Sequence, residues 1–193
     1  VSWREGVDRD NFERDPIGEL ERLYVQFGET KTEEREELAR QETAKLQAGD
    51  TENLALWKQF IDVSLQEFSS VYDRLGVVFD EVLGESAYND DLARVVGALQ
   101  ETGLAVESQG AVIIPFPEEC QPKSIAGSTL VIQKKDGAFL YGTTDLATLE
   151  YRQSRWQASE IVYVTDARQQ LHFQQIFYAW KAWRQTRRES TES

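Results

Sequence analysis

The sequence contains one cysteine, Cys120, one histidine, His172, and no methionine among its 193 residues. A single cysteine rules out an intramolecular disulfide, and one cysteine with one histidine cannot form the clusters that hold structural zinc. No apolar run approaches the roughly 20 residues that a membrane-spanning helix needs, and Val1 does not open a secretion signal. We therefore expect a cytoplasmic protein with no metal site and no membrane partner.

The chain also has few positively charged residues. It contains 21 Lys and Arg but 34 Asp and Glu, and its formal net charge is −13. Surfaces that bind nucleic acid normally carry an excess of Lys and Arg, which neutralise phosphates. This segment alone is therefore not expected to hold a nucleic acid. The hydrophobic share of 40% is typical of a folded globular chain, and the length suffices for one domain.

The first 75 residues have the periodicity of helices. Asp15 followed by Pro16 predicts a helix start, and residues 32–47 read as a solvated helix that stops at Gly49. From Asp50, apolar residues recur in steps of three and four, which predicts one long helix with a buried face. The residues of this stripe are Leu54, Trp57, Ile61, Leu65, Phe68, Tyr72 and Leu75.

The middle of the chain is expected to mix short strands with one helix. Gly76 ends the long helix and 77–79 begin a strand, after which Asn89 or Asp90 caps a helix that stops at Gly103. Two hairpins are predicted, separated by a loop with three prolines. The first joins 104–107 to 111–114, the loop covers 115–128, and the second joins Leu130 and Ile132 to Phe139 and Tyr141.

The last third alternates helix, strand and helix, at residues 145–156, 161–165 and 169–186. A strand followed promptly by a helix is typical of a doubly wound parallel sheet, whose ligands lie at the carboxyl ends of the strands. The predicted fold class is therefore α/β.

Two places in this third could bind a ligand. Asp145 follows two threonines at a predicted helix start, so it is either a helix cap or an acceptor for a cationic ligand such as a guanidinium. Gln169, His172 and Gln175 follow the predicted strand at three-residue spacing, which keeps them near one face of a helix. A structural role for His172 is the alternative.

At these residues the chain resembles the arginyl-tRNA synthetases, a family of class I aminoacyl-tRNA synthetases. The resemblance extends from about Pro16 to Trp183, and five blocks occur in the family's order and spacing. These blocks are 72–77 (YDRLGV), 84–89 (GESAYN), 103–108 (GLAVES), 133–147 (QKKDGAFLYGTTDLA) and 166–172 (DARQQLH).

The resemblance implies roles for five residues. Tyr141, Asp145 and Gln169 would bind arginine, with Asp145 as the partner of the cationic group, while His172 and Gln175 would lie beside the adenosine of ATP. ATP would be a substrate, accompanied by magnesium in the intact enzyme, and no bound cofactor is expected in this chain. The implied reaction makes arginyl adenylate and transfers arginine to tRNA.

The resemblance also implies an organisation. Residues 1–76 would be a helical segment of the catalytic domain, 77–133 a small α/β insertion with a hairpin, and 134–186 the second half of the Rossmann-like nucleotide-binding sheet, followed by a frayed tail at 187–193. Half a sheet would leave an edge exposed, so self-association is expected.

Departures from the family pattern limit the expected activity. The family's His-Ile-Gly-His-like motif and its later lysine-containing loop, both of which bind phosphates, are not found in the sequence. We therefore expect an internal fragment of the catalytic domain that is inactive alone, with tRNA held by parts it does not contain and no residue assigned as catalytic. One alternative is a non-catalytic module that retains the arginine, adenylate or partner surface. Another is an acidic helical interaction protein.

Overall fold

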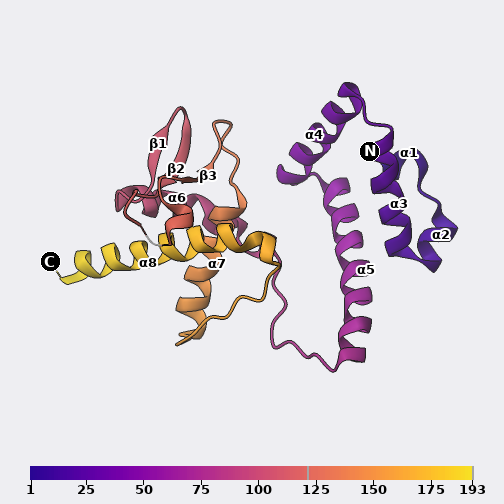
Figure 1. Cartoon of the computed structure of the whole chain (residues 1–193). Helices are drawn as coiled ribbons and strands as arrows, with labels where there is room; N and C mark the ends of the chain where they lie inside the picture. The colour runs from indigo at the N-terminus through magenta and orange to yellow at the C-terminus, as the bar shows by residue number, and fades with distance from the viewer. Residues whose placement is uncertain (121, 193) are drawn as a thin grey trace. The chain divides into compact units, whose positions relative to one another are not determined.

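The computed structural model describes residues 1–120 and 122–192. The chain divides into two compact units, unit 1 (residues 1–81) and unit 2 (residues 82–193), which are described separately. Figure 1 shows unit 1 as helices only and unit 2 as helices with a small sheet. None of the helices in the described part of the chain combines the length and apolar character that crossing a membrane requires.

Unit 1 consists of five helices, four of which begin at a side chain that caps the helix. Asp8, Asp15, Thr32 and Asp50 each accept a hydrogen bond from a backbone N–H in the first turn of the helix that follows. The helices are α1 (Ser2–Gly6), α2 (Arg9–Arg14), α3 (Pro16–Glu29), α4 (Glu33–Gln47) and α5 (Thr51–Leu75). The helix starts predicted at Asp15 and Asp50 are confirmed.

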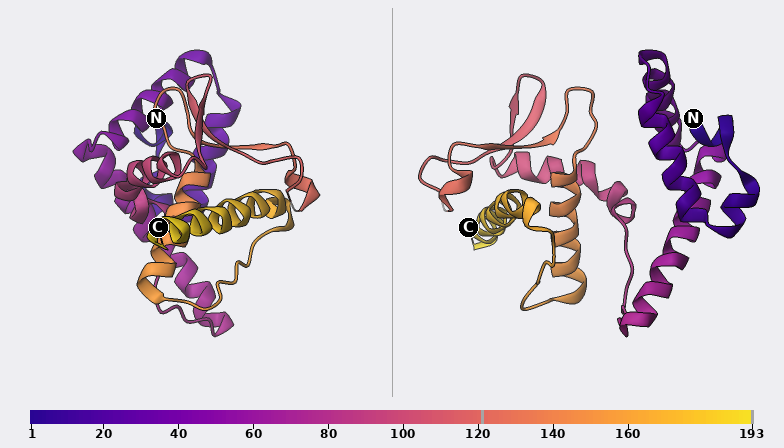
Figure 2. Two further views of the ribbon diagram at one scale, coloured as in Figure 1. Left: turned by 90° about the vertical axis from the view of Figure 1, so that its left-hand side faces the viewer. Right: turned by 45° about the vertical axis from the view of Figure 1, so that its right-hand side comes forward.

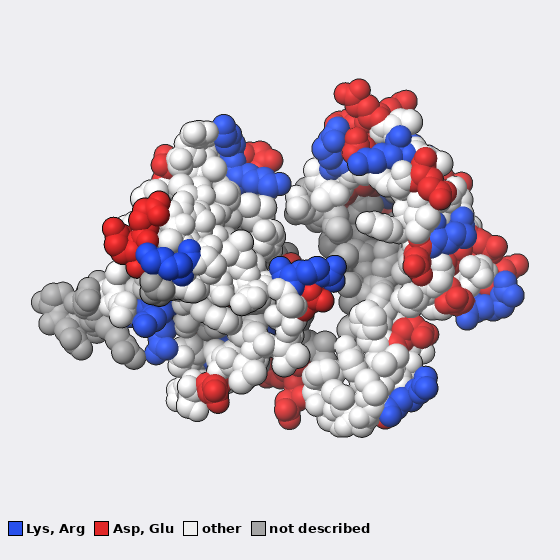
Figure 3. Space-filling view, viewed as in Figure 1, with Lys and Arg blue, Asp and Glu red and all other residues white. Residues whose placement is uncertain are grey.

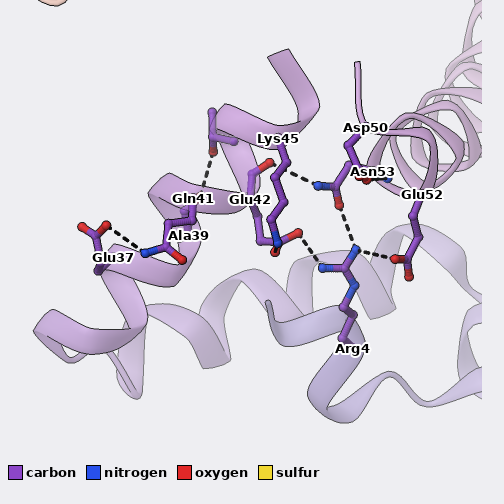
Figure 4. A network of polar contacts seen from close by, with 10 residues as sticks. Arg4, Glu37, Ala39, Gln41, Glu42, Lys45, Asp50, Glu52 and Asn53 are labelled. Atoms are coloured by element: carbon purple, nitrogen blue, oxygen red, sulfur yellow. Dashed lines mark hydrogen bonds and ion pairs between the residues drawn. The ribbon is translucent and has the colours of Figure 1, made fainter. Parts of the chain in front are cut away.

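The core of unit 1 is small and aromatic. The Trp3 ring contacts Phe12 and Phe60 edge-on, at centroid distances of 4.9 and 4.8 Å. Beside this core, the Arg4 guanidinium binds the Glu42 carboxylate at 2.5 Å and the Asn53 side-chain oxygen at 2.9 Å (Figure 4). The polar network thus joins α1, α4 and α5.

The predicted burial of the α5 stripe is wrong within unit 1. Trp57 is 38% exposed, Phe68 51% and Leu75 70%, whereas Leu56, Phe60 and Val63 pack against the core. For Phe68 and Leu75 the reason is length, because the 25 residues of α5 extend about 37 Å and the 14 residues of α3 extend about 21 Å. The C-terminal half of α5 therefore continues past its neighbours (Figure 1).

Unit 2 contains a three-stranded antiparallel sheet in the order β1-β2-β3. The strands are β1 (Val106–Ser108), β2 (Ala111–Pro115) and β3 (Thr129–Gln133), and Val106 pairs with Ile113 while Ile114 pairs with Leu130. The helices are α6 (Leu92–Glu101), α7 (Tyr141–Trp156) and α8 (Gln170–Glu192), with short 3-10 turns η1 (Glu85–Asp91), η2 (Lys123–Ile125) and η3 (Ala167–Gln169).

Helix α7 is central in unit 2, since it packs against α6, α8 and β3 (Figure 2). Its residues Leu146 and Leu149 are almost completely buried, together with Leu99 of α6, Ile132 of β3 and Trp183 of α8. This single core fixes the start of α7 relative to the start of α8, the two places where the site residues lie.

Several predicted elements differ from the structure. The first hairpin is confirmed, and the described residues between β2 and β3 form the predicted loop around the short turn η2, while Gln121 lies outside the described residues. The described residues contain no strand at 77–79 or 161–165, and no parallel pair of strands. The second hairpin keeps its turn, in which the Lys134 N–H donates to the Ala138 carbonyl, but its only bridge among the described residues joins Gln133 to Phe139, because helix α7 begins at Tyr141. An extended segment becomes a strand only beside a partner, and the described residues place none next to 161–165.

Helix boundaries in unit 2 also differ. Asn89 and Asp90 lie in η1, so α6 begins at Leu92 and not directly after them. Helix α7 begins at Tyr141, four residues before the predicted start. Helix α8 continues to Glu192 where a frayed tail was predicted, and Ser193 lies outside the described residues.

Candidate functional site

Two hydrogen bonds connect the start of α7 to β3. The Leu140 backbone N–H and the Thr143 hydroxyl both donate to the Ile132 carbonyl, at 3.0 and 2.5 Å. Thr143 is completely buried. Gly142 permits this close approach, because a Cβ there would lie 3.1 Å from Cδ1 of Leu130. The first turn of α7 therefore has a fixed position against the sheet.

Asp145 lies in the second turn of α7 and is not the helix cap, since that position belongs to Leu140. Its Oδ2 is 2.6 Å from Nε2 of His172, a residue 27 positions later on α8. Both side chains are partly buried, with 27% of Asp145 and 17% of His172 exposed. The carboxylate is thus free of a capping role, and in the described residues only Oδ2 has a hydrogen-bond partner.

Tyr141 completes a cluster with these two residues. It lies four positions before Asp145, on the same face of α7. Its ring contacts the imidazole of His172 edge-on at 4.8 Å between centroids, while the Tyr141 side chain remains largely exposed. We call Tyr141, Asp145 and His172 the α7–α8 cluster.

Gln169 lies just before α8, one helical turn before His172. Its backbone N–H donates to the Asp166 carbonyl at 2.9 Å, and the Asp166 carboxylate accepts from the Arg168 backbone N–H at 2.9 Å. The hydrogen bonds from Arg168 also lower the pKa of Asp166. The Gln169 side chain is exposed and makes no hydrogen bond to Asp145 in the described part of the chain. The fold thus brings these two residues to neighbouring turns without direct contact.

Gln175 is held by the loop between β2 and β3. Its side-chain amide donates to the Ser128 hydroxyl at 3.0 Å, and that hydroxyl donates to the Ile125 carbonyl at 2.6 Å. The neighbouring Gln174 accepts from Ser124 at 2.6 Å. The proline-rich loop therefore forms hydrogen bonds with α8. The sequence pattern did not predict these contacts, because the partners lie some 50 residues apart.

Behind the cluster lies an aromatic layer that the sequence interpretation missed. The guanidinium carbon of Arg152 is 5.1 Å from the centre of the Tyr163 ring, and that ring is 5.0 Å from Phe173, the neighbour of His172. Burial raises the pKa of Tyr163; the charge of Arg152 opposes this rise and that of Asp145 adds to it. No local sequence signal predicts this layer, because its contacts join α7 to the segment before α8 and to α8 itself.

The chemistry of the cluster suits a cationic ligand. A carboxylate with one unengaged oxygen can accept hydrogen bonds from a guanidinium, and an aromatic ring beside it adds a cation–π contact. No group of three or more His, Cys, Asp or Glu side chains that could hold a metal ion occurs in the residues that the structure describes.

In Figure 3 the visible face of each unit, taken by itself, carries Lys and Arg in separate small groups without a continuous basic strip. A nucleic-acid backbone is normally bound by such a strip.

Comparison with known proteins adds independent findings. Residues 1–189 match the family model described as "tRNA synthetases class I (R), catalytic domain". The arginine–tRNA ligase of Fusobacterium nucleatum is 42% identical over 179 residues, which are 92% of this chain and 31% of that protein. The arginine–tRNA ligase of Idiomarina loihiensis is 45% identical over 183 residues, again 92% of this chain and 31% of that protein. The chain thus spans about a third of the length of these relatives.

Solved structures agree with the sequence matches. The arginyl-tRNA synthetase of Plasmodium falciparum superposes with a TM-score of 0.66 at 27% identity, over 88% of this chain and 28% of that one. A putative arginyl-tRNA synthetase from Campylobacter jejuni superposes with a TM-score of 0.57 over 81% of this chain and 33% of that one, and at 19% identity it supports the fold alone.

Proposed function

Because the chain belongs to the arginine-specific class I tRNA synthetases, we propose that unit 2 carries part of the arginine-binding surface of an arginine–tRNA ligase. The intact ligase would activate arginine with ATP to arginyl adenylate and then transfer arginine to tRNA. The observation that carries the proposal is the Asp145 carboxylate, which α7 presents from its second turn with Oδ1 unengaged and the Tyr141 ring on the same face.

In this proposal Oδ1 of Asp145 accepts hydrogen bonds from the guanidinium of arginine, and Tyr141 covers the ligand from the solvent side. Gln169, one helical turn from His172, would reach the ligand from the start of α8. Its exposed side chain is free to turn, whereas Asp145 is held by His172. The pocket would thus combine one fixed carboxylate with one adaptable amide.

ATP is proposed to lie along the face of α8 that carries His172 and Gln175. The amide nitrogen of Gln175 is already bonded to Ser128, so its carbonyl oxygen is the atom left to accept a hydrogen bond from an adenine amino group. The described residues offer no cluster of three ligands for the magnesium that accompanies ATP. Phosphates and magnesium would therefore be held by other parts of the ligase.

The nucleotide-binding sheet of the intact enzyme would include residues 161–165. This segment is extended, and its residues Val162 and Val164 are 73% and 95% exposed. Exposed valines in an extended run are typical of a strand whose neighbours are supplied from elsewhere. We propose that these residues form a strand of the Rossmann-like parallel sheet there.

Calorimetry with arginine tests the proposed pocket. Asp145→Asn removes the charge but keeps the shape, so arginine binding is expected to weaken by roughly tenfold or more, the value of one charge-assisted hydrogen bond. Glu160→Gln is the matched control, because Glu160 is an exposed carboxylate of the same unit, and it should leave the affinity unchanged. Equal affinities for wild type and Asp145→Asn would contradict the proposal.

An ATP–pyrophosphate exchange assay with arginine tests the expected inactivity of this chain alone. With a single histidine, the sequence holds no His-Ile-Gly-His-like motif to bind phosphates. Arginine binding without exchange is the expected result, and robust exchange would show that the chain positions phosphates by other means.

A further inference from the structure

His172 binds Oδ2 of Asp145, the carboxylate whose other oxygen, Oδ1, the proposed function assigns to arginine. The Nε2 atom of His172 and the Oδ2 atom of Asp145 are 2.6 Å apart, and the two residues come from different helices. Asp145 accepts no other hydrogen bond in the described part of the chain. The contact therefore fixes the orientation of the carboxylate, and it also places a group that can become cationic on the intended partner of a cationic substrate.

From this geometry we infer that His172 is a positioning residue that makes arginine binding dependent on pH. The inference rests on the proposed function of Asp145. With a neutral imidazole, Nε2–H donates to Oδ2, Nδ1 carries no proton, and the cluster keeps the negative charge of Asp145 for the guanidinium. When Nδ1 gains a proton, the pair becomes neutral overall and its hydrogen bond strengthens, so the attraction for arginine decreases.

The surroundings of His172 leave Asp145 as the group that controls this change. From α7 the imidazole faces Asp145 and Tyr141, and on its own helix it contacts Phe173. One layer further back are Tyr163 and the cation of Arg152, which lies over the Tyr163 ring. Arg168 and Asp166, which precede α8, form an ion pair with each other.

The sign of the effect follows from the charges. The guanidinium of arginine stays protonated at all of these pH values, whereas an imidazole ordinarily changes charge between pH 5 and 8. Arginine should therefore bind more weakly as pH falls. By linkage, arginine binding at pH 6 should release a fraction of a proton to the buffer.

Calorimetry with arginine at pH 7.5 and pH 5.5 tests the inference with two matched variants. The dissociation constant of the wild type is expected to rise by roughly tenfold at the lower pH, the value of one charge-assisted hydrogen bond. His172→Gln retains an N–H donor for Oδ2 but cannot titrate, so its affinity for arginine should not change between pH 7.5 and pH 5.5. His172→Phe keeps a ring against Tyr141 without the donor, so it should bind several-fold more weakly at pH 7.5.

A flat pH profile for the wild type, or an unchanged slope in His172→Gln, would overturn the inference. Because His172 is the only histidine, nuclear magnetic resonance of its ring nitrogens in the ligand-free chain reports on the pairing by itself. We expect a clear change of both ring-nitrogen signals in Asp145→Asn, because the partner of Nε2 changes. Identical signals in the two proteins would refute the pairing. If arginine does not bind at any pH while the pairing of His172 with Asp145 is intact, the proposed function is refuted, together with the pH dependence of arginine binding that rests on it.

Discussion

Gly142 allows the first turn of α7 to pack directly against β3. A Cβ at this position would meet three atoms of the buried Leu130 side chain at 3.1 to 3.3 Å, so rotation of one methyl group cannot relieve the crowding. Gly97, in the interior of α6, has no atom within 4 Å of the corresponding position. The packing of α7 against β3 therefore requires glycine at position 142, whereas position 97 has room for a larger side chain.

The pair Gly142→Ala and Gly97→Ala tests this difference. Gly97→Ala should raise the free energy of unfolding by about 0.5–1 kcal/mol, the usual gain of alanine over glycine in a helix. In Gly142→Ala, crowding against Leu130 should cancel this gain. Its free energy of unfolding should therefore be lower than that of Gly97→Ala by at least about 1 kcal/mol. Urea unfolding followed by circular dichroism measures both, and equal stabilisation of the two variants would count against the tight contact.

The role of Asp145 illustrates the limits of local sequence patterns at this scale. Its position after two threonines fits a helix cap, but the hydrogen bonds from Leu140 and Thr143 to Ile132 start the helix four residues earlier. These bonds link residues up to 11 positions apart through the sheet. The structure excludes the capping role, and ligand binding by Asp145 stays a prediction that rests on the resemblance to the synthetase family.

At the scale of elements, a buried carboxylate joins α2 to α3. Glu19 is completely buried and accepts hydrogen bonds from the Asp8 backbone N–H at 2.8 Å, from the Asn11 side chain at 3.0 Å and from Arg22 at 2.8 Å. Chiefly because of the hydrogen bond from Arg22, the pKa of Glu19 is lowered from 4.5 to about 2.

The lowered pKa predicts acid sensitivity of this junction. A carboxyl group whose pKa is lower in the folded state stabilises the fold fully above its unfolded value, and this stabilisation is lost as pH falls from about 4.5 towards 2. Thermal unfolding between pH 6 and pH 2.5 should show a smaller loss of stability in Glu19→Gln than in the wild type. Glu21→Gln, an exposed site on α3, is the control and should keep the wild-type slope. Identical slopes for Glu19→Gln and the wild type would contradict the account.

Secondary-structure elements were predicted best where residues close in sequence determine their ends. Asp15 with Pro16, Asp50 and Gly76 mark helix ends through contacts within four residues, and the structure confirms them. The strands predicted at 77–79 and 161–165 failed for the opposite reason, because a strand depends on a partner that local sequence does not specify. The α5 stripe was recognised as apolar, but its burial depends on what packs against it.

At the scale of the whole molecule, large apolar side chains remain on the surface. They include the α5 stripe in unit 1 and Val162 and Val164 in unit 2. Exposed apolar faces and unpaired extended segments favour association. The chain also spans only about a third of the length of its curated relatives, which is consistent with such faces being covered in those longer proteins.

Analytical ultracentrifugation tests the expected self-association. The wild type should form dimers or larger species at increasing concentration, and Val164→Lys should reduce them by charging the extended segment. Val78→Lys is the matched control, because Val78 is 90% exposed but belongs to unit 1 and not to the extended segment 161–165. A monomer at every concentration would contradict the prediction.

The central claim is that the α7–α8 cluster recognises the positive charge of arginine. The most direct measurement follows the ring-nitrogen signals of His172, the only histidine of the chain, during titration with arginine and with citrulline, which has the same shape but a neutral urea group. We expect arginine to shift these signals in a saturable way and citrulline to leave them nearly unchanged. Equal shifts with both ligands, or none with arginine, would contradict the claim.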